Sequence, residues 1–162
     1  QAGSFRKLCE ILIEGRQITV KHGHLALKSY SPKISARQMK QMDELMNTLI
    51  QHGVSAPAQG NLIRDMGIAP TDLKLFLKLL SEEVKIRMFG KNIVLTDVLE
   101  HCRSKLLEMF EEKPEIEVRE FRDETGLGRT LAVALLEHFD NEGMTQRKDN
   151  SRTLIRKPIN NS

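Results

Sequence analysis

Hydrophobic residues recur at helical spacing in two long stretches of the chain, residues 42–50 and 98–110. Ser35 is suited to cap the first of these helices, and Thr96 with Asp97 is suited to cap the second. Two further apolar-periodic segments follow the second stretch, on either side of a Gly-Leu-Gly turn. The pattern predicts helices over residues 36–51, 98–112, 118–125 and 129–141.

The pattern changes to short alternating runs after each set of helices. Residues 84–88 and 93–95 flank a Gly-Lys-Asn turn, and residues 144–147 and 152–155 flank Lys-Asp-Asn-Ser. Such pairs of runs predict β-hairpins. Each unit is therefore expected to run helix, short helix, helix and hairpin.

The two units also resemble each other in sequence. The string that begins Arg64-Asp65-Met66-Gly67 is similar to the one that begins Arg122-Asp123 and ends at Gly126, 58 to 59 residues later. A partial third copy in residues 11–27 matches the last helix and hairpin of a unit. We therefore expect the chain to be a fragment that opens with the tail of an upstream domain.

A three-helix unit of about 60 residues closed by a hairpin is a winged helix. The fold class expected is α+β, mainly α, with tandem winged-helix domains, each a helix-turn-helix plus a β-hairpin wing. Pro70 suits a first helical turn, and Gly126 and Gly128 allow a sharp turn between two helices. The expected division is a preceding domain's tail over 1–33, a spacer winged helix over 34–96, an RNA-binding winged helix over 97–158 and a tail over 159–162.

Composition excludes several classes of function. The sequence contains no phosphate-binding loop, nucleophile elbow or zinc-protease motif, so we expect no enzyme in this fragment. Cys9 and Cys102 lack metal-ligand spacing and favour reduced thiols, and His22-Gly23-His24 has no acidic or thiol neighbour. We expect no metal, no cofactor in this fragment, no membrane segment and a cytoplasmic location.

The formal net charge of +3 conceals an uneven distribution. From Gly143 onward five basic residues stand against Asp149 alone, whereas residues 98–142 carry six basic and twelve acidic groups. A basic end of this kind attracts polyanions through its local field, although a solvated tail is the plain alternative.

The two units differ at the start of their third helix. Gly128-Arg129-Thr130 offers free backbone N–H groups and a guanidinium to an anion. The first unit has Pro70, which lacks an N–H, and Asp72, whose carboxylate occupies the same dipole end. Only the second unit is expected to bind phosphate.

The remaining candidate residues lie on the short helix and around the second hairpin. Arg122 faces either the same groove or its neighbours Asp123 and Glu124, and Lys148 is either a phosphate contact or a solvated turn residue. The candidate nucleic-acid-binding residues are Arg122, Gly128, Arg129, Thr130, Arg147, Lys148, Asn150, Ser151 and Arg152. Each phosphate contact is expected to add about one unit to the log–log salt dependence of binding.

Structured RNA fits these features better than duplex DNA. The helix predicted over residues 129–141 has no lysine or arginine after Arg129, and a major-groove reader normally needs a basic helix face. The six Phe and one Tyr favour core packing over base stacking. A compact basic end suits an RNA loop.

The string from Phe121 to Thr130, continued through residues 135–140 to Arg147 and Arg152, resembles the last winged helix of SelB, the bacterial selenocysteine-specific translation elongation factor family. The resemblance covers nearly the whole chain, as the end of a second winged helix followed by a third and a fourth. Thr130 and the turn Lys148-Asp149-Asn150 depart from the family's usual residues.

The resemblance implies that the last module binds the apical loop of the selenocysteine insertion hairpin in mRNA and that the preceding module is a spacer. By position, Arg129 matches the basic residue that opens the recognition helix, and Arg147 and Arg152 match those beside the wing turn. GTP, the ribosome and selenocysteyl-tRNA belong to family domains outside this chain, which is expected to be a monomer. The alternatives are a dimeric duplex-DNA-binding winged-helix regulator and a winged-helix protein-interaction scaffold.

Overall fold

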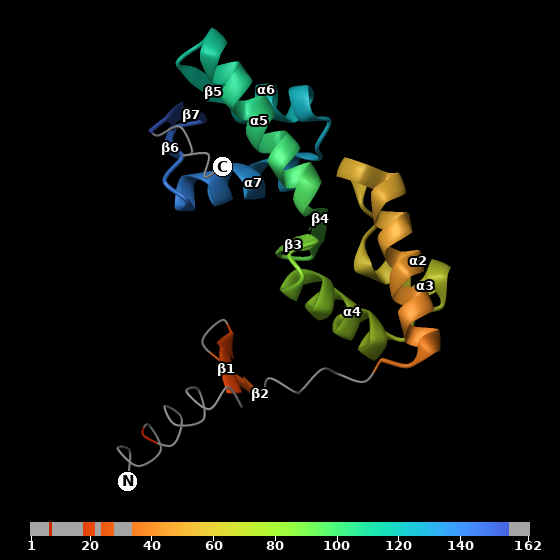
Figure 1. Ribbon diagram of the computed structural model, residues 1–162. Helices are drawn as coiled ribbons and strands as arrows, with labels where there is room; N and C mark the ends of the chain where they lie inside the picture. The colour runs from red at the N-terminus through yellow and green to blue at the C-terminus, as the bar shows by residue number, and fades with distance from the viewer. Residues whose placement is uncertain (1–6, 8–17, 22–23, 28–33, 156–162) are drawn as a thin grey trace. The chain divides into compact units, whose positions relative to one another are not determined.

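The computed structural model describes residue 7 and residues 18–21, 24–27 and 34–155 (Figure 1). The chain divides into two compact units, one ending at Arg37 and one beginning at Gln38. No helix among the described residues is long and apolar enough to cross a membrane.

The first unit contains an antiparallel hairpin. Strands β1 (Ile18–Lys21) and β2 (His24–Leu27) pair so that Ile18 lies opposite Leu27. This agrees with the hairpin of the partial third copy. The helix predicted before this hairpin, the turn predicted at His22-Gly23 and Cys9 lie outside the described residues. The predicted boundaries at 33, 96 and 158 stay predictions.

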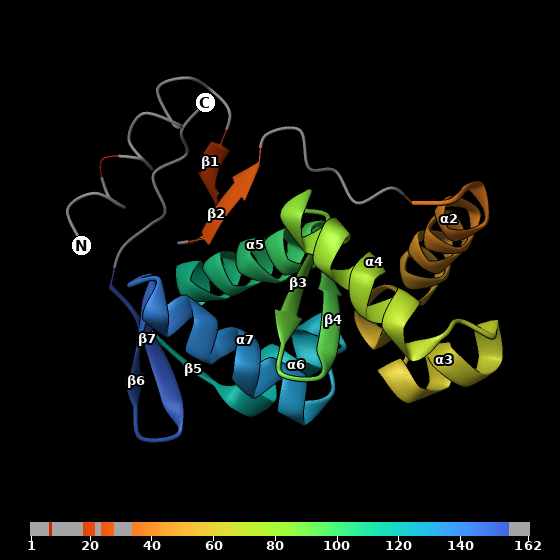
Figure 2. The ribbon, with the colours of Figure 1, turned by 90° about the horizontal axis from the view of Figure 1, so that it is seen from below.

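The second unit contains two modules with the predicted order of elements. The first module comprises α2 (Ala36–His52), a 3₁₀ turn (Gly53–Ser55), α3 (Gln59–Met66), α4 (Pro70–Glu82), β3 (Ile86–Phe89) and β4 (Asn92–Leu95). The second module comprises α5 (Thr96–Glu112), β5 (Glu115–Glu117), α6 (Val118–Thr125), α7 (Arg129–Asn141), β6 (Thr145–Lys148) and β7 (Ser151–Leu154). We call β3–β4 the first wing and β6–β7 the second wing; Figure 2 shows both hairpins. Both modules are winged helices, and the mainly helical fold class predicted from the sequence is confirmed.

The two modules repeat at a fixed interval of 59 residues from α3 onward. Helices Gln59–Met66 and Val118–Thr125, and the strands of both wings, keep this interval. Gly67 and Gly126 end the paired short helices in the same left-handed conformation, with φ of 62° and 70°. At this interval Arg122 is equivalent to Ile63. The sequence alignment that placed Arg122 on Arg64 is therefore shifted by one residue.

Each module has its own hydrophobic core, and the first wing contributes to both. On one face of this hairpin Ile86 and Ile93 join the core of the first module. On the other face Val94 joins the core of the second module, and Phe89 packs against it, 5.2 Å from the His138 ring. Each face of the first wing thus contributes to one of the two cores, and the second module's α7 packs against β3.

Two local expectations were wrong, and one strand was not predicted. Thr96 does not cap α5, since its hydroxyl donates instead to the carbonyl of Val84. A third strand, β5, pairs with β7 in a sheet of order β5–β7–β6. The second wing turns through Asp149 and Asn150 alone, because Asp149 adopts a φ of 53° and lets Lys148 pair with Ser151.

Val84 occupies a strained position at the end of α4. Its φ of 59° lies in the left-handed region, where a β-branched residue is an outlier, and its side chain is half exposed. Gly143 stands at the same place after α7, with φ of 71° and the same pair of backbone hydrogen bonds to the helix end.

Val84→Gly is therefore expected to raise the free energy of unfolding by about 1 kcal/mol, as relief of the strain exceeds the added chain entropy. Urea denaturation measures the change. Gly143→Val is the matched control and should destabilise by about 1–2 kcal/mol. A loss of stability in Val84→Gly would contradict this interpretation.

Candidate nucleic-acid interface

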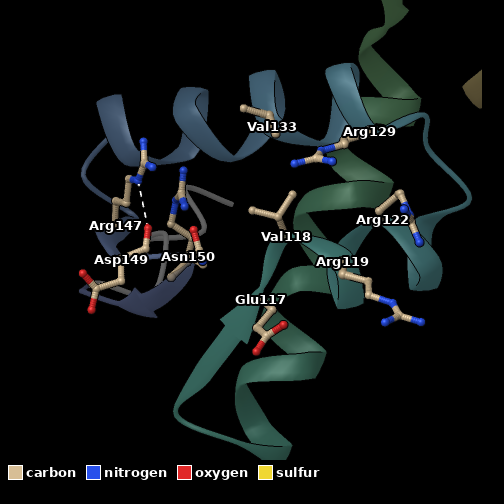
Figure 3. Close-up of a pocket in the computed structure, with 10 residues that line it drawn as sticks. Glu117, Val118, Arg119, Arg122, Arg129, Val133, Arg147, Asp149 and Asn150 are labelled. Atoms are coloured by element: carbon tan, nitrogen blue, oxygen red, sulfur yellow. Dashed lines mark hydrogen bonds between the residues drawn. The ribbon is translucent and has the colours of Figure 1, made fainter.

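A pocket of about 390 Å³ opens between the α6–α7 turn and the second wing (Figure 3). Half of its lining residues are arginines. The lining consists of Glu117, Val118, Arg119, Arg122, Arg129, Val133, Arg147, Asp149, Asn150 and Arg152. Five candidate residues from the sequence therefore meet in one place: Arg122, Arg129, Arg147, Asn150 and Arg152.

The α6–α7 turn presents the start of a helix to the pocket. Gly126 ends α6 in the left-handed region, and Gly128 is the extended residue that precedes α7. No side chain caps α7, and its first turn contains no acidic residue. The free N–H groups and the helix dipole at Arg129 and Thr130 therefore favour an anion.

Two of the arginines keep their charge for a ligand. Arg129 and Arg147 are exposed, and within the described part of the chain neither has a carboxylate partner. Arg147 Nε donates to the backbone carbonyl of Asp149 at 3.1 Å, which fixes the side chain without neutralising it. In Figure 3 the side chains of Val118 and Val133 lie between these two arginines. The arrangement offers two guanidinium groups on either side of an apolar floor.

Two arginines on α6 share one carboxylate. Arg122 donates to Asp123 Oδ1 from Nε at 2.8 Å and from Nη2 at 2.5 Å. Arg119 Nε lies 3.7 Å from the other oxygen of Asp123. Of the two interpretations that the sequence left open, Arg122 fulfils both, since it lines the pocket and pairs with its neighbour.

Arg152 differs from the expectation of an exposed nucleic-acid contact. Its side chain is only 2% exposed, and its Nε donates to Asp140 Oδ2 at 2.7 Å. Asp140 in turn accepts a hydrogen bond from the Thr145 hydroxyl at 2.6 Å. The guanidinium is therefore paired inside the module and lines the pocket from within, and we correct its assignment from direct contact to structural support.

Lys148 and Ser151 are directed to a different partner. Lys148 Nζ lies 2.5 Å from Glu115 Oε1, and the Ser151 hydroxyl donates to the other oxygen of Glu115. The hydrogen bond that Lys148 donates to Glu115, together with the opposite charges of the two groups, lowers the pKa of Glu115 and raises the pKa of Lys148. Lys148 is thus a strand residue paired with Glu115 rather than a solvated turn residue, and its contact with phosphate stays a prediction.

An acidic hollow adjoins the cationic pocket. Glu115, Glu117 and Glu120 line it together with Lys113 and the turn residues of the second wing. A hydrogen bond from Lys113 and a second one from the Glu117 amide lower the pKa of Glu120. Glu117 lines both hollows, so this edge of the pocket repels a polyanion and restricts its path.

Sequence reasoning missed half of the lining. Glu117, Val118, Arg119, Val133 and Asp149 were not candidates. The available signal was the spacing of Arg119 and Arg122, which places two arginines on one face of a short helix. The valines gave no signal of their own, because an apolar helical residue is normally assigned to a core.

The first module shows the same backbone frame without the charge. At the 59-residue interval, none of the five pocket arginines has a basic counterpart. Their counterparts are Gly60, Ile63, Pro70, Met88 and Ile93. The fold therefore does not require arginine at any of these positions, and the contrast expected at the helix starts extends to the whole pocket.

The described residues contain no group of His, Cys, Asp and Glu that would hold a metal ion. Cys102 is a free, fully buried thiol, and this burial raises its pKa to about 11. A thiol with so high a pKa stays protonated and inert at neutral pH.

Comparison with known proteins identifies related chains. Residues 108–154 match the family described as "Elongation factor SelB, winged helix". The chain is 24% identical over 148 residues to the selenocysteine-specific elongation factor of Desulfomicrobium baculatum, covering 91% of this chain and 23% of that protein. It is 37% identical over 76 residues to the corresponding factor of Haemophilus influenzae, covering 47% of this chain and 12% of that protein.

A solved structure shares the fold. The mRNA-binding domain of elongation factor SelB from E. coli, determined in complex with SECIS RNA, matches with a TM-score of 0.64 and 22% identity. The match covers 76% of this chain and all of that one. The resemblance that the sequence indicated is thus confirmed, since residues 108–154 match a winged helix of the elongation factor SelB family.

Proposed function

We propose that this chain is the mRNA-hairpin-binding part of a selenocysteine-specific elongation factor and that the cationic pocket binds the loop of a selenocysteine insertion hairpin. The observation that carries the proposal is that Arg129 and Arg147 line one pocket with Val118 and Val133. Neither arginine has a carboxylate partner among the described residues. The guanidinium groups suit two phosphates, and the valines between them suit the face of an unpaired base.

A hairpin loop suits this pocket better than a duplex. Helix α7 carries a cation only at Arg129, so its length offers no basic face to a groove. The acidic hollow beside the pocket also opposes a long, straight phosphate backbone. A compact loop with splayed bases presents phosphate and base together within a small volume.

The relatives support the same assignment. The E. coli domain with this fold was determined with SECIS RNA. The first module lacks all five arginines, and one face of its wing packs against the second module, which suits a spacer. These features disfavour the two alternatives, a duplex-DNA regulator and a protein-interaction scaffold.

The chain spans about a quarter of the first curated relative and about an eighth of the second. We propose that GTP binding and hydrolysis, selenocysteyl-tRNA and the ribosome are handled by other parts of the whole protein. The proposed setting is the cytoplasm, and the proposed state of this part is a monomer that performs no catalysis and binds no cofactor of its own.

The test measures fluorescence anisotropy with labelled SECIS hairpins, including the one bound by the E. coli domain, at two salt concentrations. The comparison ligands are the isolated duplex stem and a hairpin with a replaced loop. We expect the authentic hairpin to bind at least about tenfold tighter than either, because mispositioned bases each cost about 1–3 kcal/mol. Equal affinity for all three RNAs would refute loop recognition, and tighter binding to duplex DNA would favour the regulator.

A further inference from the structure

Asp140 joins both strands of the second wing to the helix that carries Arg129. Its Oδ2 accepts a hydrogen bond from Arg152 Nε on β7 at 2.7 Å, and its Oδ1 accepts one from the Thr145 hydroxyl on β6 at 2.6 Å. Thr145 and Arg152 are both almost fully buried. One carboxylate in the last turn of α7 therefore fixes the second wing against the helix.

The same contact acts on Arg147. Arg147 and Arg152 are directly opposite each other in the β6–β7 ladder, so their side chains leave the same face of the hairpin. Two like charges in this arrangement repel each other. Because Asp140 neutralises Arg152, Arg147 is able to keep its exposed place at the pocket with its charge unpaired.

The first module closes its wing without such a contact. Ser81 stands in place of Asp140, and the buried Ile86 and Ile93 stand in place of Thr145 and Arg152. A buried ion pair is no more stabilising than well-packed apolar residues of similar volume. Stability of the fold therefore does not explain the pair in the second module. There Arg147 lies opposite Arg152, whereas in the first module the uncharged Met88 lies opposite Ile93.

We propose that Asp140 and Arg152 are positioning residues for RNA binding. They set the second wing on α7 so that Arg147 meets the ligand at a fixed distance from Arg129. The inference rests on the proposed function, since it concerns how the same pocket is held in shape. Arg152 acts through Arg147 and makes no phosphate contact of its own.

The test replaces two residues of the second module with their equivalents in the first module, in the double variant Asp140→Ser/Arg152→Ile. Circular dichroism and thermal unfolding should show a folded module, and affinity for the SECIS hairpin should fall about tenfold, the loss of one charge-assisted contact. Arg147→Met, which should weaken the unmodified chain about tenfold, should weaken the double variant by less than about twofold. Arg129→Met should still weaken both backgrounds.

If Arg147→Met weakens hairpin binding equally in the unmodified chain and in the double variant, the inference is overturned, and Arg152 has a direct or purely structural role.

If the double variant fails to fold, Arg152→Lys replaces it in the same cycle, because lysine keeps the ion pair with Asp140. This variant should retain most of the affinity for the hairpin, and Arg147→Met should weaken it as much as it weakens the unmodified chain. A large loss of hairpin affinity in Arg152→Lys, although its ion pair with Asp140 is kept, would contradict the inference. Failure of the proposed function is distinguishable, because the unmodified chain would then not discriminate the hairpin at all.

Discussion

Reversing the charge of Arg129 and Arg147 together should weaken SECIS hairpin binding by at least about a hundredfold. Each guanidinium is expected to make a charge-assisted contact of about 1.5–3 kcal/mol, and each glutamate adds repulsion. The slope of log affinity against log salt should also fall by about two units, because two phosphate contacts are lost. Fluorescence anisotropy over a salt series measures both quantities.

The matched control is Lys74→Glu/Arg87→Glu in the first module. Both residues are exposed, and the double substitution changes the net charge of the chain by the same amount. Only the long-range part of the attraction should be lost, so the affinity should change by a few fold. Equal losses in the two double variants would mean that RNA responds to overall charge rather than to the pocket.

Val94→Asp should produce the largest loss of stability among the substitutions considered. Val94 belongs to the first wing but is 2% exposed within the core of the second module. A carboxylate there loses its hydration without gaining a partner, which costs several kcal/mol. Modules of about 60 residues have small cores, so this loss should also release the first wing from α7.

Urea denaturation and limited proteolysis measure the effect. Met88→Asp is the control, because Met88 lies on the opposite face of the same hairpin and is 38% exposed. Its cost should be well below 1 kcal/mol, as for a surface substitution. A Val94→Asp variant as stable as Met88→Asp would contradict the packing of the two modules into one compact unit.

The helices could be predicted from the sequence because local signals determine their ends. Predicted and observed bounds coincide for α6 and α7, where Gly126 and Gly128 interrupt a strong helical period. Strand β5 could not be predicted, since three residues carry little periodicity and their ladder partners on β7 lie more than thirty residues away.

The site could be predicted only where a local feature of the sequence identifies a residue. Arg129 is identified by its place at a helix start, which is a local feature of the sequence. The burial of Arg152 depends on Asp140, and the pairing of Lys148 depends on Glu115 across the sheet. Such tertiary contacts decide which cations stay available, and a count of basic residues near Gly143 does not reveal them.

The most direct measurement is photocrosslinking with 4-thiouridine placed at single positions in the loop of the SECIS hairpin. Mass spectrometry then locates the crosslinked peptides. We predict crosslinks to the α6–α7 turn around Arg129 and to the second wing around Arg147, all abolished by an excess of unlabelled hairpin. Crosslinks confined to the first module, or unaffected by that competitor, would contradict this prediction.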